Sequence, residues 1–288
     1  MAWTQLQPQV ENESTEGILD QLFEILNRIS GTRRYVFRGH ASALWPHLVP
    51  SIHRALGPDK SLTQRVRIEA AGIRTFRRHA RSMLQASELA YFDKILDGLT
   101  LMQHYGAPTR LLGWTLSPWV ACYFASDSGH DEDGVIWAFN HDKLNTKNHE
   151  QSESREFKRF RKLEDSSTVE AWAAAAAEQA GSYISIFRYQ YANPQMGAQQ
   201  SLFTVTGELG ENHDEALAKS LPGAEDTLRV MVPRSCKKDL RRRLLQMNVC
   251  ALSLFPSING VGLHVTEAIQ CNFLSDEGLL LALMDKLR

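Results

Sequence analysis

The sequence of 288 residues is poor in cysteine and holds no long apolar run. Its four cysteines are far apart and form no Cys-x-x-Cys pair, which argues against a zinc site or a disulfide framework. No stretch approaches the roughly 18 apolar residues of a membrane span. The first residues lack the basic start and apolar core of a secretory signal. We therefore expect a protein of the reducing cytoplasm with no membrane partner.

Motifs of the common nucleotide-binding enzymes and hydrolases are also missing. There is no GxxxxGK phosphate loop, no GxGxxG after a strand, no HExxH and no GxSxG. The formal net charge is −1, so no overall field draws the protein to nucleic acid. The acidic residues at 127–133 have no spacing that imposes ligand geometry, and we expect a solvated turn there and no metal.

What is present is an ordinary globular composition, 43% hydrophobic and 23% charged, which allows a sizeable core. We expect a loose N-terminal tail over residues 1–14 and a single domain over residues 15–288. A basic helical segment is expected at 62–103, as two helices over 62–84 and 87–103. Residues 140–168 are a polar insertion without apolar rhythm and are expected to form a long loop, a lid or a disordered insertion.

Apolar residues at helical spacing predict a first helix from Thr15 to Gly31 and a buried helix after Ser117. Further helices are expected at 171–180, at 235–247 and, Leu-rich, at 277–287. Strands are expected at 35–37, ending at Gly39, and at 135–139, 183–191, 202–206, 228–232 and 249–255. Helices dominate the first half and no regular βαβ rhythm appears. This pattern favours an α+β fold with a mixed central sheet and a helical N-terminal half.

Arg38 is the first residue that suggests chemistry. It follows three apolar residues and precedes Gly39, so it is expected at a strand end that a ligand can approach closely. A guanidinium is always charged and suits bidentate binding of phosphate or carboxylate. The alternative is a buried arginine paired with an acid of the core, and the motif alone leaves both open.

The segment 104–118 gathers His, Tyr, Arg, Trp, Thr and Ser side chains in a stretch that is not a regular element. Such loops, leading into a buried helix, are typical of ligand sites on a rigid scaffold. Ser117 and the free amides of the following helix suit an anion. The alternative is an elaborate structural turn in which Arg110 and His104 satisfy buried carbonyls.

Two further features complete the candidates. The segment 193–203 is rich in amides that either read a ligand's polar edge or cap a turn between strands. On the basic helix, four arginines at offsets of seven, four and three share one face and are candidates for contact with nucleic acid: Arg67, Arg74, Arg78 and Arg81. The alternative for them is a solvated face.

These segments, in this order, resemble the FRG domain, named for Phe-Arg-Gly, here Phe37-Arg38-Gly39. The resemblance extends through WPHLVPSIHR (45–54), the run at 101–125, the element at 199–203 and an ending at 232–262. Two departures bear on activity. The family pattern reads Leu-Leu-Asp-Trp-Thr, where this chain has Gly113 in place of the Asp. It also carries an Arg and a Gly where Gln195 and Ser201 stand here.

The order of residues also resembles, more loosely, that of ADP-ribosyltransferases, which begin with a strand-borne Arg or His and end with a late Glu or Gln. This resemblance implies NAD as substrate without a metal, and a bacterial anti-phage or toxin–antitoxin effector whose acceptor is nucleic acid or protein and whose partner is an antitoxin. Catalytic positions would be Arg38, Gln199, Gly113 and Ser117. NAD contacts would come from Arg38, Gly39, His104, Tyr105, Thr109, Arg110, Trp114 and Thr115. The rival interpretation is a binding module that breaks no bond, because Gly113 removes the one carboxylate of the densest motif.

Overall fold

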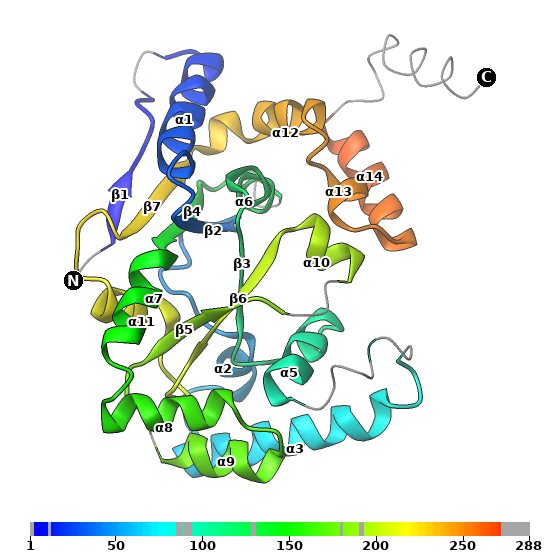
Figure 1. Cartoon of the computed structure of the whole chain (residues 1–288). Coiled ribbons are helices and arrows are strands. Elements are labelled where there is room, and N and C mark those ends of the chain that lie inside the picture. The colour runs from blue at the N-terminus through cyan, green and yellow to red at the C-terminus, as the bar shows by residue number, and fades with distance from the viewer. Residues whose placement is uncertain are drawn as a thin grey trace.

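The computed structural model describes residues 3–10, 13–84, 88, 94–127, 131–178, 181–189 and 193–271. Within them a seven-stranded sheet in the order β1-β7-β4-β2-β3-β6-β5 is surrounded by helices (Figure 1). The strands are β1 (Thr4–Leu6), β2 (Tyr35–His40), β3 (Leu112–Thr115), β4 (Gly134–Asn140), β5 (Ile184–Phe187), β6 (Ser201–Thr206) and β7 (Thr227–Val232). The expected α+β fold with a mixed sheet is confirmed.

The N-terminal segment is part of the sheet, which corrects the expectation of a loose tail. β1 pairs with β7 in parallel, whereas the other neighbouring strands are antiparallel. Trp3 packs edge-on against Trp137 of β4, with ring centroids 4.8 Å apart. A three-residue edge strand has too little periodicity to be recognised, and its pairing with a strand more than 220 residues later is a tertiary effect.

β2 lies at the centre of the sheet and carries the Phe-Arg-Gly motif. The expected break at Gly39 is not found. β2 continues to His40 and pairs with β4 along its whole length. On its other side it pairs with β3 at a single position, Phe37 with Thr115. Because β2 and β3 pair at this one position only, no further pairing holds the two strands together beside it.

Helices form three groups around the sheet, and the third, with α7 and α11, shares a core with β2, β3 and β4. The first, with α1, α6, α12 and α13, shares a core with β2, β4 and β7. The second, with α2, α3, α5, α8 and α9, shares a core with β6. Their bounds are α1 (Thr15–Ser30), α2 (Ser51–Leu56), α3 (Leu62–Ala80), α5 (Ile95–His104), α6 (Pro118–Ala125), α8 (Arg155–Glu164), α9 (Val169–Ala177), α12 (Lys237–Gln246) and α13 (Ala251–Leu254). The others are α7 (His141–Glu150), α10 (Pro194–Ala198), α11 (His213–Ser220), α14 (Ile258–Gln270) and a 3-10 turn at Arg234–Cys236.

The polar segment 140–168, expected as a loop or lid, is helical and packed. It forms α7 and α8, each started by a side-chain cap, Asn140 and Ser154. In α8 the buried residues Phe157, Phe160 and Leu163 recur every third residue, while the rest of the helix is charged. Three apolar residues in a very polar segment are too few to predict the helix from the sequence. They suffice, however, to bury one face of α8.

A further correction concerns residues 249–255, expected as a strand. They contain the short helix α13, whose N-cap residue Cys250 takes part in a capping box with Ser253. Ala251 and Leu254, three residues apart, turn into the core. The expected helix at 277–287 lies outside the described residues. Of the helix expected at 87–103, most residues before Lys94 also lie outside them, and α5 begins at Ile95.

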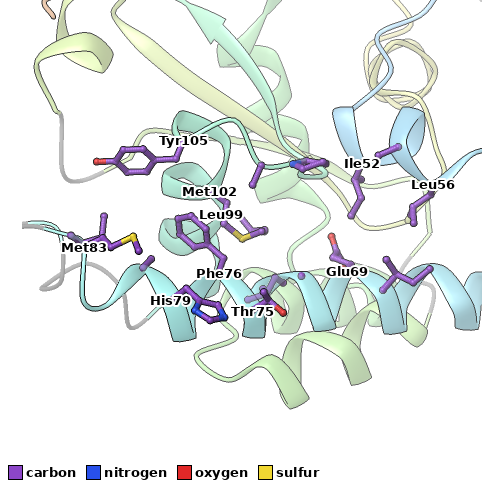
Figure 2. A pocket seen from close by; sticks show the side chains of 18 residues that line it. Ile52, Leu56, Glu69, Thr75, Phe76, His79, Met83, Leu99, Met102 and Tyr105 are labelled. Atoms are coloured by element: carbon purple, nitrogen blue, oxygen red, sulfur yellow. The ribbon is translucent and has the colours of Figure 1, made fainter.

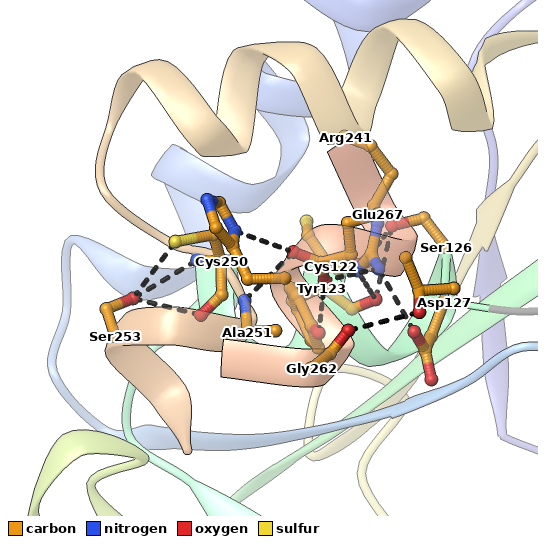
Figure 3. Close-up of polar contacts among 12 residues, drawn as sticks. Cys122, Tyr123, Ser126, Asp127, Arg241, Cys250, Ala251, Ser253, Gly262 and Glu267 are labelled. Atoms are coloured by element: carbon orange, nitrogen blue, oxygen red, sulfur yellow. Dashed lines mark hydrogen bonds and ion pairs between the residues drawn. The ribbon is translucent and has the colours of Figure 1, made fainter. Parts of the chain in front are cut away.

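A buried ionic cluster holds α12 and α14 against α6 (Figure 3). Arg241 donates to Glu267 Oε1 over 2.7 Å and lies over the ring of Tyr123 of α6, whose hydroxyl donates to the same carboxylate. Burial and this hydrogen bond raise the pKa of the Tyr123 hydroxyl, so it stays protonated. The cluster therefore fixes the helix that covers β2.

None of the helices in the described part of the chain is long and apolar enough to cross a membrane. The four cysteines are buried and free.

Two glycines offer a matched test of this packing. A Cβ on Gly39 would lie 2.6 Å from the backbone nitrogen of Ala125 and even closer to the Ala121 carbonyl, so α6 rests directly on the strand. We expect Gly39→Ala to lower the free energy of unfolding by about 1–3 kcal/mol or more, as overpacking does. Gly72, inside α3, has nothing within 4 Å of its Cβ position. There the same substitution should instead stabilise by about 0.5–1 kcal/mol. Urea unfolding of both variants measures the difference; equal effects would contradict the close contact.

Candidate functional site

A cavity of about 300 Å³ lies beside the single pairing position of β2 and β3. The Phe-Arg-Gly motif, the segment 104–118 and the segment 193–203 all contribute to it. Its lining residues are Phe37, Arg38, Gly39, Gln103, His104, Gly113, Trp114, Thr115, Val120, Phe124, Gln195, Met196, Gln199, Ser201 and Phe203. Strands β2, β3 and β6, the end of α5, one face of α6 and the short helix α10 thus form its walls.

Arg38 enters the cavity from β2 and is half-buried. Its Nε donates to His40 Nε2 over 3.0 Å and its Nη1 donates to the Gly113 carbonyl over 2.7 Å. Neither acceptor is negatively charged, and within the described residues no carboxylate forms an ion pair with Arg38. Burial and the nearby Arg54 lower its pKa to about 10, which leaves it charged at neutral pH. The acid that the structural alternative requires is not found there.

His40 orients this guanidinium. Burial, and then the positive charge of Arg38, lower the pKa of His40 to about 3, so the ring is neutral at physiological pH. Since Nε2 accepts from Arg38, the proton lies on Nδ1, which is buried without a hydrogen bond in the described structure. His40 therefore contributes an acceptor and no charge.

Gly113 faces Arg38 across the cavity. A Cβ placed there would meet Gln103 Nε2 at 3.7 Å and Arg38 Nη1 at 3.9 Å, which are ordinary contacts. A side chain fits at this position, and its two polar neighbours are both N–H donors. The space above Gly113 is therefore suited to a negatively charged or acceptor group.

Gln103 is a residue that sequence reasoning missed. It stands in the last turn of α5, where the pattern indicates only an amphipathic helix. Its Oε1 accepts from Thr109 Oγ1 over 2.7 Å, which turns its Nε2 toward Gly113. The signals for it were its position directly before the dense segment and its place in the run at 101–125 that resembles the FRG domain.

Thr115 and Gln199 are in contact at the wall of the cavity formed by β3 and the end of α10. The Thr115 hydroxyl donates to the Gln199 carbonyl over 2.7 Å and accepts from Ser117 N, so it is engaged by the backbone on both sides. The Gln199 amide donates from Nε2 to the Leu254 carbonyl over 3.1 Å. These bonds connect the end of α10 to β3 and to α13, and Gln199 lines the cavity. His104 also lines it, and burial lowers the pKa of His104 against the raising effect of Glu88.

Several predicted ligand residues do not line the cavity. Ser117 accepts from Val120 N and caps α6. Thr109 is buried and bound to Gln103. Tyr105 donates to Glu88 over 2.9 Å and borders a different cavity. Trp114 does border the site, but its Nε1 donates to Thr204 and its ring packs against Phe139 in the core.

Arg110 is structural. It is fully buried, its Nε donates to Glu69 Oε1 over 2.6 Å and its Nη2 donates to the other oxygen of the same carboxylate. Trp172 completes the cluster, since its Nε1 donates to Glu69 and its ring lies 4.8 Å from the guanidinium carbon. A ligand has no access to this arginine, and for Arg110 the structural alternative describes the arrangement.

The basic face of α3 is separate from the cavity. Its four arginines are exposed, and Arg74 forms an ion pair with Glu170 at 3.3 Å. Within the described residues no three His, Cys, Asp or Glu side chains gather in a way that would hold a metal ion.

The family model of the FRG domain matches residues 33–134. The chain contains an FRG domain. This domain supplies Arg38, Gln103, His104 and Gly113, whereas Gln199 lies beyond the match, which is shorter than the resemblance through residue 262 that the motifs suggest. No curated protein and no solved structure matches the chain. The resemblance to ADP-ribosyltransferases accordingly stays a prediction.

The two buried arginines allow a paired test. Arg110→Met would leave Glu69 buried without its cation, and we expect a loss of about 3–5 kcal/mol in the free energy of unfolding. Arg38→Met leaves no unpaired carboxylate, only the two hydrogen-bond acceptors on His40 and Gly113. It should lower the free energy of unfolding by about 1 kcal/mol. Guanidinium unfolding of both variants distinguishes them. A larger loss for Arg38→Met would mean that the FRG arginine is structural.

Proposed function

We propose that the Arg38 cavity binds a phosphate-bearing nucleotide, with NAD as the first candidate. One observation carries this proposal: a half-buried guanidinium held by two neutral acceptors, without a carboxylate partner in the described structure. A charge removed from water is costly unless it is paired. Its Nη2 makes no hydrogen bond within the described residues and stays available to a ligand.

The shape and chemistry of the cavity define which part of a nucleotide it suits. A volume of about 300 Å³ is at the small end of ligand pockets. It suits a phosphate with one sugar or one ring, so that the rest of a dinucleotide would extend outside. Arg38 and Gln103 offer donors on one side, while Phe124 and Phe203 provide apolar walls against a ring.

An ADP-ribosyltransferase-like effector is the first candidate for the chemistry that a bound nucleotide would undergo. It is supported by Arg38, Thr115 and Gln199, which come from three distant segments and line one cavity in the order that the resemblance implies. In such a reaction the bond between nicotinamide and ribose breaks, nicotinamide leaves with the electron pair, and an acceptor atom of nucleic acid or protein bonds to the ribose carbon and loses its proton. Arg38 would hold a phosphate while the apolar wall limits access of water.

A binding module that breaks no bond is the second candidate, and a specific observation favours it. None of the residues that line the cavity in the described structure is an aspartate or a glutamate. The proton of the acceptor would therefore have no carboxylate to receive it, and a cationic transition state would have none to stabilise it. Gly113, where the FRG pattern has Asp, is the position at which the two candidates differ.

Binding is tested by titrating the protein with NAD, ADP-ribose and pyrophosphate in a calorimeter. We expect Arg38→Gln to weaken binding at least about tenfold, since hydrogen bonds to a charged group contribute about 1.5–3 kcal/mol. The matched control Arg78→Gln, on the exposed face of α3, should bind as the parent does. The affinity for NAD and ADP-ribose should be constant from pH 6 to 8.5, because their diphosphate stays fully ionised over this range while the pKa of Arg38 is about 10 and that of His40 about 3. Binding that strengthens below pH 6 would assign the anion to His104.

The choice between the candidates is tested with Gly113→Asp. The Cβ fits, and the carboxylate would lie beside Arg38 and Gln103. We expect this carboxylate to compete with the ligand's phosphate and to reduce its affinity at least about tenfold, as an ion pair with a buried arginine would. Nicotinamide release and label transfer to RNA or lysate protein are then measured at saturating NAD. Activity of the variant or the parent supports the transferase; binding without activity in either supports the module.

A further inference from the structure

A second, larger cavity lies between α2, α3 and α5 (Figure 2). It has a volume of about 800 Å³ and is lined almost entirely by apolar side chains. Its floor consists of buried residues of the second core: Ile52, Leu56, Ile73, Leu99 and Met102. At its edge Ile68 is 43% exposed and Met83 is 83% exposed, so the cavity is a groove open to solvent.

One wall of the groove is a continuous stripe of α3 and the turn after it. Ile68, Gly72, Thr75, His79 and Met83 recur at intervals of four, three, four and four residues, which places them on one face of the helix. At about 1.5 Å per residue this stripe is roughly 22 Å long. Gly72 has nothing within 4 Å of its Cβ position, so the middle of the stripe is hollow. These dimensions suit the face of a helix of about four turns.

The helix that forms this wall of the groove carries an excess of positive charge. α3 holds five arginines and a single acid, Glu69, which is buried against Arg110. Arg67 and Arg78 directly precede Ile68 and His79 and are exposed, so cations stand on the solvent side of the stripe. The whole chain has a net charge of −1, so the excess of positive charge on α3 is local.

We propose that this groove binds an amphipathic helix of a partner protein, with apolar residues on one face and acidic residues on its flanks. Apolar side chains at helical spacing fill such grooves, and complementary charge at the rim selects the partner. Nucleic acid fits less well: among the described residues that line the groove there is no arginine or lysine, and His79 alone of them is able to carry a positive charge. The observations behind this proposal do not depend on which ligand binds at Arg38.

The test is a selection with the full chain from a displayed library of helices. Apolar residues are fixed at positions i, i+4, i+7 and i+11, and the remaining positions are random. Selection on the parent is compared with selection on the double variant Ile68→Glu, Met83→Glu, whose substitutions lie at exposed positions and whose folding is checked by thermal melting. We expect helices enriched in Asp and Glu on the parent alone.

One enriched peptide is then measured by fluorescence anisotropy. Ile68→Glu should weaken its binding at least about tenfold, because a carboxylate replaces an apolar side chain of the stripe and repels the acidic flanks of the helix. Ile258→Glu is the matched control: it places the same carboxylate on an exposed isoleucine of α14, outside the groove, and should bind within about twofold of the parent.

Four outcomes overturn the proposal. The first is equal enrichment on the parent and the double variant. The second is preference for Lys-rich helices. The third is binding of single-stranded RNA that Ile68→Glu abolishes. The fourth is self-association of the chain that the same substitution abolishes, which would make a second copy the occupant.

Discussion

The buried ion pair of Arg110 and Glu69 is the constraint on which both cavities depend. Glu69 belongs to α3 and also accepts from Trp172 of α9, so the pair joins two helices to the segment before β3. The Arg110 carbonyl lies 3.1 Å from His213 Nε2, and this ring bonds to Thr204, to which Trp114 donates. Through this chain of contacts one charge pair sets the start of β3, and with it the place where Gly113 faces Arg38. The same carboxylate lies in the wall of the apolar groove.

The two arginines of the FRG segments show how similar residue types take different roles. Arg110 has a carboxylate in bidentate contact, and it lies in the core where an unpaired charge would not persist. Arg38 has only a neutral ring and a carbonyl, and it borders a cavity that water or an anion can enter. The first arrangement is complete without a ligand. The second lacks a negative charge, and Gly113 leaves room for one within reach of two donors.

Local signals predicted much of the fold, and long-range contacts account for what they missed. The helix after Ser117 combines a capping side chain, a proline in its first turn and an apolar surface, all of which lie within ten residues. α8 has a stripe of three residues in a charged helix, and β1 exists because β7 lies beside it. The segments of the site were recognisable by their residue types. That Arg110 points into the core depends on Glu69, which is 41 residues earlier in the chain.

The end of α5 connects the two cavities. Leu99 and Met102 face the apolar groove, whereas the next residues, Gln103 and His104, line the Arg38 cavity. A helix moves as a rigid unit over a single turn, so an occupant of the groove that shifts Met102 also shifts the Gln103 amide beside Gly113. Thermodynamic linkage makes such an effect reciprocal: a ligand at Arg38 would change the affinity of the groove by the same factor. The last turn of α5 lies between two cavities of different chemistry. Through this turn, binding at one site would change the affinity of the other.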